Sequence, residues 1–294
     1  PAARGLTTVL RAVTLSRVLG PVKRMRISAL LALWLLLSLA VAPTGDFSLY
    51  DDWVYSWAAR SFHSGRGLDI VEWSAAVPLF QVLWGALFLH LGSGEFVLRL
   101  ATLAAALAGN ICWYAFLRRR GLERGDATFS VALLLFNPVY FLLSLTFMTD
   151  VFFLSLCQIF FYLAARWREK PSWPAAALWI LALLAAGFTR QLGVALAAAV
   201  AAAALASRRR GLAWAALVAV AVIGTGQWAF VGHTGGGLPL GQRFSALASI
   251  FSVSPGLYAE GLVVAAAFVG LALAPAALRA PAVSVVKYGL PDPA

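Results

Sequence analysis

Carboxylates are rare in this chain, which has 12 Asp and Glu among 294 residues, so two adjacent acids are conspicuous. Asp51 and Asp52 follow the first long apolar segment, and Asp150 stands at the start of another. Arg190 lies between two further apolar segments. A carboxylate can accept a proton or bind a cation, and a guanidinium is well suited to binding a phosphate. These residues are therefore the first candidates for chemistry.

The composition places these candidates in a membrane protein. The chain is 62% hydrophobic and 12% charged, with a mean hydropathy of +0.84. A soluble domain has about 45–50% apolar residues and about 25% charged residues. Several apolar runs reach the roughly 20 residues that are needed to cross a bilayer. The sequence therefore predicts an all-α, polytopic bundle of transmembrane helices.

The net charge of +11 is compatible with either a nucleic-acid-binding protein or a membrane protein with basic cytoplasmic loops. Most Lys and Arg lie in clusters beside apolar segments, at 1–26, 118–124, 166–170 and 208–210. The charge is thus divided among loop ends and forms no basic domain. We therefore expect a membrane and no nucleic acid as partner.

The apolar candidates lie at 27–42, 75–91, 96–117, 127–145, 150–165, 173–189, 191–206, 211–231 and 257–278. If 75–91 crossed the membrane, the last three basic clusters would fall outside, against the positive-inside rule. We therefore expect 75–91 to lie at the outer interface. The stretch 173–206 should cross twice, with a tight turn that uses Gly187 and Gly193. This threading predicts about eight spans, with both ends inside.

On this threading the candidate residues share the outer face, where an ionisable group at a membrane end is costly unless it is used or paired. Each has a structural alternative. One Asp of the pair could cap a helix over "DWVYSWAARSF", Asp150 could cap the next span, and Arg190 could snorkel to the interface. Adjacent residues at a helix start point about 100° apart, so Asp51 and Asp52 should have separate roles.

A longer pattern surrounds these residues. "DDWVYSWAARSFHSGRG" has an Asp followed by an acid, a Tyr, an Ala-rich turn and a Gly. A Pro-led helix in "AVPLFQVLWG", the basic "WYAFLRRRG", the Pro-containing "LLLFNPVYF" and a second acid in "FMTDVFF" follow. Over about residues 46–200 this pattern resembles the GT-C glycosyltransferases, a family that includes protein O-mannosyltransferases and lipid A aminoarabinose transferases. The basic residue that members often carry before the Pro-led helix is absent here.

The resemblance implies an inverting membrane glycosyltransferase. The enzyme would move a hexosyl or pentosyl group from a polyprenyl-phosphate donor to a hydroxyl of a lipid, glycan or protein acceptor. The alternative is a polytopic transporter, or a flippase for lipid-linked sugars, without transferase activity.

The resemblance also implies roles for the site residues. Asp51 would be the catalytic general base. The implied residues for binding substrate and phosphate are Asp52, Asp150, Arg190, Arg66 and Arg99. The resemblance leaves open whether a divalent metal ion takes part, for which Asp52 and Asp150 would be the ligands.

The expected organisation has a cytoplasmic basic N-terminus (1–26) and a catalytic transmembrane core (27–206) that contains the outer loop 43–95. Further spans and the C-terminus follow in 207–294, a region that we expect to be incomplete. We expect a multi-pass protein of the plasma (inner) membrane. Its N-terminus would be cytoplasmic and its active site would face the outside or periplasm.

Overall fold

The computed structural model describes residues 25–42, 44–71, 74, 78–206, 208 and 210–234. All of them belong to one unit, residues 1–237, whereas the second unit, 238–294, lies outside the described residues together with the predicted span 257–278. The described elements are α2 (Ile27–Val41), α3 (Asp52–His63), α4 (Leu79–Phe88), η1 (Leu89–Leu91), α5 (Glu95–Arg119), α6 (Arg124–Leu135), α7 (Pro138–Ser144), α8 (Thr149–Glu169), α9 (Trp173–Gly187), α10 (Leu192–Ala206) and α11 (Arg210–Thr234). The predicted all-α class is confirmed for this part of the chain.

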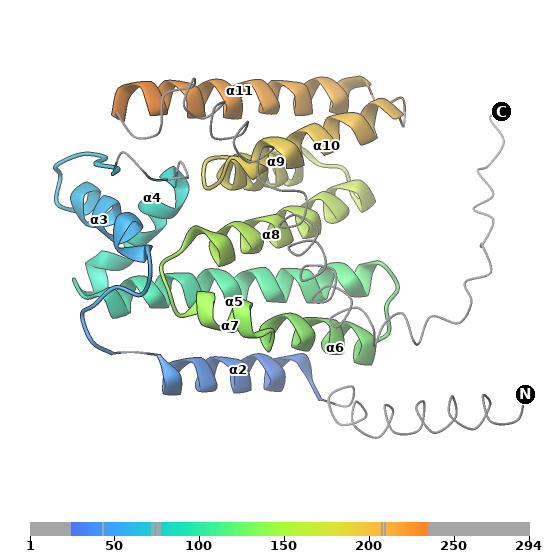
Figure 1. The fold of residues 1–294 in the computed structure, drawn as a ribbon. Coiled ribbons are helices and arrows are strands. Elements are labelled where there is room, and N and C mark those ends of the chain that lie inside the picture. The colour runs from blue at the N-terminus through green and yellow to red at the C-terminus, as the bar shows by residue number, and fades with distance from the viewer. Residues whose placement is uncertain are drawn as a thin grey trace, which may run out of the picture. The chain divides into compact units, whose positions relative to one another are not determined.

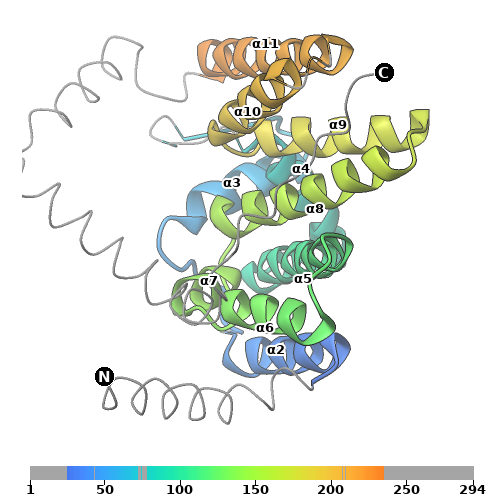
Figure 2. The ribbon, with the colours of Figure 1, turned by 90° about the vertical axis from the view of Figure 1, so that its right-hand side faces the viewer.

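The long helices run side by side in a stack (Figures 1 and 2). From α2 the order is α6 with α7, then α5, α8, α9 with α10, and α11, while α3 and α4 pack together at one end of α5. One core lies between α2, α5, α6 and α7, where Trp34, Leu103 and Leu135 are buried. A second core joins α8 to α11 through Phe160 and Ile223. Continuous apolar sequences give helices that are buried on more than one side.

The predicted number of spans is wrong for the described residues. Only α5 and α8 are long and apolar enough to cross a membrane alone, and α6 with α7 would make a third span. The helices α2, α9 and α10 have 15 residues each. Such a helix covers about 22 Å, less than the hydrocarbon thickness of about 30 Å. Each predicted apolar segment within the described residues contains a helix, but apart from α5 and α8 these helices are shorter or less apolar than a full span.

The predicted single span 127–145 is a broken pair of helices. The axes of α6 and α7 differ by 67°. The break precedes Pro138, which cannot continue the hydrogen-bond ladder of α6. Asn137 restarts the chain as the N-cap of α7, because its side chain accepts hydrogen bonds from the N–H groups of Val139 (3.0 Å) and Tyr140 (3.2 Å).

The segment predicted to lie along the interface, 75–91, is described from Pro78 onward and forms α4 and η1. The 10 residues of α4 cover too little length for a span. The helix packs against α3 and α5 instead. A Cβ atom on Gly85 would lie 2.4 Å from Cζ of Phe147, so only glycine permits the close approach of α4 to this ring.

The tight turn predicted between two apolar helices is confirmed. α9 ends at Gly187 and α10 begins at Leu192. A Cβ atom on Gly193 would lie 2.4 Å from Cα of Gly187, so the two glycines let the chain fold back on itself. Gln227 of α11 donates to the carbonyl of Gly187 (2.6 Å), which fixes this turn against the last described helix.

Candidate functional site

The adjacent acids at the start of α3 lie in opposite environments. Tyr50, with φ of 55°, turns the chain into α3. Asp51 occupies the N-cap position, but its side chain makes no capping hydrogen bond and is exposed. Asp52, the first residue of the helix, is completely buried. The predicted separation of the two carboxylates is therefore observed, while capping does not explain Asp51.

Asp52 binds the chain segment that leads into α8. Its Oδ2 accepts a hydrogen bond from the N–H of Phe147 (3.3 Å), and Gln81 of α4 donates to the carbonyl of the same residue (2.7 Å). Oδ1 of Asp52 has no hydrogen-bond partner among the described residues. Burial raises the pKa of Asp52 to about 6, and the charge of Glu95 acts in the same direction. Asp52 thus holds the backbone of Phe147 in place, and its carboxyl group is a weaker acid than an exposed aspartate.

Asp150 and Arg190 form an ion pair between the first turn of α8 and the α9–α10 turn, with Nη1 donating to Oδ1. Both side chains are partly exposed, at 38% for Asp150 and 28% for Arg190. Asp150 does not cap α8, because the N-cap position belongs to Met148. The N–H of Phe80 donates to the carbonyl of Phe188 (3.1 Å), which ties α4 to the turn that carries Arg190. The structure therefore brings these two predicted residues together.

Tyr55 is a residue of this site to which the sequence assigned no role. Its hydroxyl interacts with the side chains of Thr149 and Ser74 and lies near both charges of the Asp150–Arg190 pair. Burial raises its pKa, so the phenol stays protonated and can donate a hydrogen bond. The sequence feature that could have indicated this role is the position of Tyr55 three residues after Asp52, which places both side chains on one face of the helix.

Arg99 corrects the prediction of a phosphate ligand. Its side chain is completely buried, and Nη1 donates to the carbonyl of Gly45 (3.2 Å). Nη2 donates to the carbonyl of Phe47, whose ring centroid lies 5.3 Å from the guanidinium carbon. Because the guanidinium holds the segment before α3, we assign it a structural role.

A second set of polar contacts fixes the same segment. Oδ1 of Asp46 accepts from the N–H of Glu95 (2.8 Å) and from Arg60 (3.3 Å). These two donors hold the pKa of Asp46 below its usual value. Glu95 also accepts from Arg60 (3.0 Å) and from the hydroxyl of Ser56 (2.8 Å). The contacts join the loop, α3 and α5 into a support for the acids at the start of α3.

Arg66 lies apart from this network at the C-terminal end of α3. Its side chain is exposed, Nε donates to the hydroxyl of Ser64 (3.0 Å), and the guanidinium carbon lies 5.4 Å from the ring centroid of Trp57. The structure shows no contact between Arg66 and the Asp150–Arg190 pair. An exposed guanidinium can still reach a mobile ligand, so its phosphate-binding role stays a prediction.

The residues do not fit a divalent metal ion. Within the described ranges no three His, Cys, Asp or Glu side chains are grouped as a metal site. Asp52 is buried with one oxygen bonded to Phe147, and Asp150 is paired with Arg190. Two carboxylates held in this way offer no coordination shell for a hard cation. We therefore derive no step that passes through a metal.

Comparison of the chain with protein-family models, with curated proteins and with solved structures finds no match in any of the three. The described fold and site define the class: a helical protein with two to three helices that are long and apolar enough to span a membrane. At one end of its long helices lie a partly exposed ion pair, a buried tyrosine and an exposed aspartate.

Proposed function

We propose that this chain is a membrane glycosyltransferase that moves a sugar from a polyprenyl-phosphate donor to an acceptor hydroxyl, with inversion at the anomeric carbon. The proposal rests on the resemblance of residues 46–200 to the GT-C glycosyltransferases and on the chemistry of the site. The single observation that carries it furthest is the partly exposed Asp150–Arg190 pair beside Tyr55.

Arg190 is the proposed ligand of the donor phosphate. Without substrate its charge is balanced by Asp150, so the guanidinium is held in place without being buried. A phosphate that approaches can accept the remaining N–H groups of this guanidinium, which are suited to bidentate binding. The hydroxyl of Tyr55 lies close enough to the pair to add a neutral donor. As the sugar leaves, these donors would stabilise the charge that grows on the phosphate.

Asp51 is the proposed general base. It is the exposed member of the acid pair, and its carboxylate makes no hydrogen bond with a described residue. The acceptor oxygen would form its bond to the anomeric carbon while the bond from that carbon to the phosphate oxygen breaks. The acceptor proton would pass to Asp51, and the bonding electron pair would leave with the polyprenyl phosphate. Asp52, which is buried, would position the start of α3 for this step.

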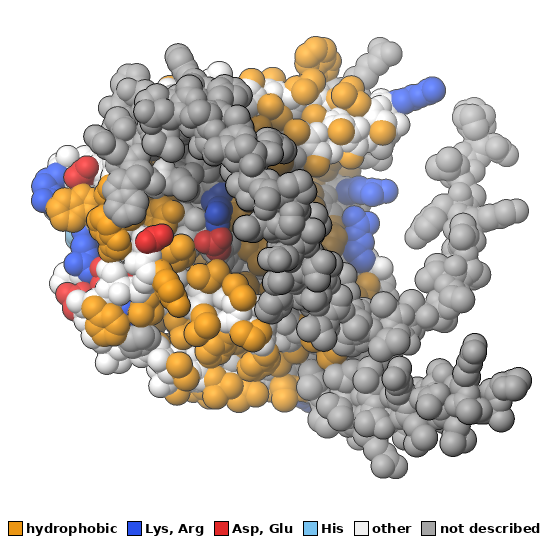
Figure 3. All heavy atoms as spheres, viewed as in Figure 1, with side chains coloured by type: hydrophobic (Ala, Val, Ile, Leu, Met, Phe, Trp, Pro, Cys, Tyr) orange, Lys and Arg blue, Asp and Glu red, His pale blue; other side chains and the backbone are white. Residues whose placement is uncertain are grey.

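The proposed location is the plasma (inner) membrane, with the α3–α4 end of the unit on the outer or periplasmic side. In the space-filling view, Asp and Glu side chains lie over the α3–α4 end and toward the middle (Figure 3). The charged side chains visible at the opposite edge are Lys and Arg (Figure 3). Lys and Arg side chains lie at the α3–α4 end as well, so the support for a cytoplasmic opposite edge is that the charges visible there are all basic (Figure 3).

One observation favours a second candidate, a transporter or flippase of lipid-linked sugars. The 67° break between α6 and α7 is the kind of interrupted helix from which transporter sites are built. The ion pair, however, lies at the start of α8 and not halfway along it. A lipid carrier would need to contact its substrate deeper in the membrane, so we prefer the transferase.

The test uses the full chain in proteoliposomes with a labelled polyprenyl-phosphate sugar and a panel of hydroxyl acceptors. Wild-type protein should release free polyprenyl phosphate and form a labelled glycoside. Arg190→Gln should raise KM for the donor by about tenfold or more, as expected for the loss of a charged hydrogen-bond donor. Arg120→Gln, which removes an exposed charge after α5, is the matched control and should leave KM unchanged. Movement of the donor across the bilayer without any glycoside would support the flippase and contradict the transferase.

A further inference from the structure

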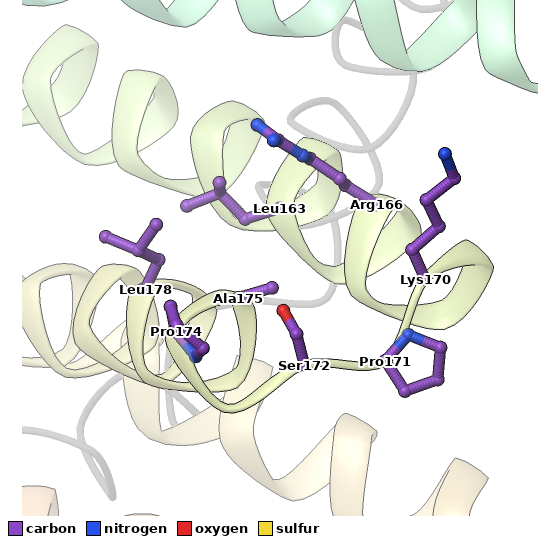
Figure 4. A pocket seen from close by; sticks show the side chains of 8 residues that line it. All are labelled: Leu163, Arg166, Lys170, Pro171, Ser172, Pro174, Ala175 and Leu178. Atoms are coloured by element: carbon purple, nitrogen blue, oxygen red, sulfur yellow. The ribbon is translucent and has the colours of Figure 1, made fainter.

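A cavity of about 330 Å³ lies where α8 ends and α9 begins (Figure 4). It is far from the proposed active site, because the 20 residues from Asp150 to Lys170 correspond to about 30 Å of helix. Arg166 and Lys170 contribute two cations, and Ser172 contributes a hydroxyl. Figure 4 shows the hydroxyl of Ser172 directed toward α8. The polar side chains that line the cavity are therefore two cations and one hydroxyl, with no acid among them.

The two cations of this cavity have no acid partner among the described residues. Arg166 lies in the last turn of α8, and Lys170 is the C-cap residue that follows it, so two positive charges meet at this end of the helix. Neither forms an ion pair with a described acid, since Glu169 pairs with Arg119 instead. Ser172 occupies the N-cap position of α9, but its hydroxyl makes no capping bond, so it can donate to a ligand. An anion bound at the α8–α9 connection would be attracted by both positive charges and could accept a hydrogen bond from Ser172.

The remainder of the cavity is apolar. Leu163 of α8 and Pro174 and Leu178 of α9 line it, and Leu178 is 51% exposed. The neighbouring Trp173 is 80% exposed, as is typical of an aromatic side chain at a membrane interface. A free phosphate would use only the cationic part of this cavity. A phospholipid would use both parts, with its phosphate at the helix ends and an acyl chain along the leucines.

We propose that this cavity binds the headgroup of an anionic phospholipid through Arg166, Lys170 and Ser172, with one acyl chain along Leu163 and Leu178. The site does not depend on the proposed transferase activity. It lies at the basic end of the unit, which on the proposed sidedness faces the cytoplasm, where anionic lipids bind basic pockets between membrane helices. The bound lipid would fix the α8–α9 connection at the membrane surface.

The experiment measures ligand binding to the detergent-purified full chain by its tryptophan fluorescence. The probes are a short-chain phosphatidylglycerol, a short-chain phosphatidylcholine and inorganic phosphate. We expect saturable binding of phosphatidylglycerol, weaker binding of phosphatidylcholine and no displacement by inorganic phosphate. R166Q/K170Q should weaken the binding of phosphatidylglycerol by at least about tenfold, as expected for the loss of two charged contacts. R120Q/R168Q removes the same charge from residues outside the cavity and should bind like the wild type.

The following results test whether the site is specific and whether its ligand is a lipid or a free phosphate. Equal losses in both double variants would overturn the proposal, because the effect would then come from diffuse charge. Inorganic phosphate that binds as tightly as the lipid and displaces it would replace the lipid site by a simple anion site. Leu178→Asn should weaken the lipid and leave inorganic phosphate unaffected. If R166Q/K170Q does not fold, K170Q alone changes only an exposed side chain and should still weaken the lipid measurably.

Discussion

The two ends of α8 differ in whether their charged side chains are paired within the protein. At its start, Asp150 is paired with Arg190, and nearby Arg60 and Arg99 have acceptors on the same unit. At its end, Glu169 pairs with Arg119, but Arg166 and Lys170 have no acid partner among the described residues. The difference indicates that the first end is held together by its own polar contacts, whereas the second has charge available for a ligand. It also predicts that substitutions at the first end affect stability far more than those at the second.

The largest effect is expected at Arg99. Replacement by Met removes the buried donors to the carbonyls of Gly45 and Phe47 and a positive charge near Asp52. A hydrogen bond to a charged group contributes about 1.5–3 kcal/mol to the unfolding free energy, and Arg99→Met removes two of them. Denaturant unfolding in detergent micelles checks the value. The exposed Arg66→Met is the matched control, and an equal loss in both variants would contradict the structural role assigned to Arg99.

Asp52 should make stability depend on pH. Its folded pKa is about 6 against an ordinary 3.8, so the folded protein binds the proton more tightly than the unfolded chain. The contribution of Asp52 to stability should therefore be greatest below pH 4 and fall as the pH rises to 6, by up to about 3 kcal/mol at 1.36 kcal/mol per pKa unit. Asp52→Asn keeps an acceptor for the N–H of Phe147 and should remove this part of the pH dependence. Identical pH profiles for the wild type and D52N would show that Asp52 does not titrate as the burial implies.

A smaller effect is expected from the close packing of α4. Gly85→Ala would place a Cβ atom 2.4 Å from the ring of Phe147 and 3.2 Å from Ala59, so the ring must shift. Overpacking of this kind costs about 1–3 kcal/mol. Gly211→Ala makes the same change in α11 where no atom lies within 4 Å. Alanine favours a helix over glycine by up to about 1 kcal/mol, so the midpoint of thermal unfolding of Gly211→Ala should stay or rise. An equal fall of the midpoint in both variants would contradict the contact with Phe147 as the cause of the cost.

The smallest effect is expected at the basic end. R166Q/K170Q removes two exposed charges that have no acid partner among the described residues, so unfolding free energy in detergent without phospholipid should change by less than about 0.5 kcal/mol. Denaturant unfolding measured beside Arg99→Met checks the contrast between the two ends. A loss as large as that of R99M would mean that the basic end is also held by its own contacts.

Much of the helical layout could be predicted from the sequence. Apolar runs located α2, α5, α8, α9 and α10, and the paired glycines located the turn that joins the last two. Helix length could not be read from hydropathy, because apolar loop residues such as Phe188 extend a run beyond the helix itself. Pro138 indicates a possible break in the segment 127–145, but hydropathy alone predicts a single span there.

The site was predicted less completely than the layout. Spacing predicted that Asp51 and Asp52 would diverge, but it could not show which one would be buried. That choice depends on the backbone of Phe147, which is 95 residues away in the chain from Asp52. For the same reason the sequence predicts a phosphate ligand at Arg99, although its contacts to residues 45 and 47 give it a structural role. The ion pair of Asp150 with Arg190 is likewise a tertiary contact. The sequence predicts only that both residues lie at the outer face of the membrane.

The most direct test of the central claim compares Asp51→Asn with Glu123→Gln in the transfer assay. Both substitutions neutralise an exposed acid at a helix N-cap, one at the start of α3 and one at the start of α6. If Asp51 is the general base, D51N should lower the rate of sugar transfer by about 10²–10⁴-fold while its unfolding midpoint stays at the wild-type value. E123Q should transfer sugar at the wild-type rate. Transfer by a folded D51N protein at the wild-type rate would contradict the account.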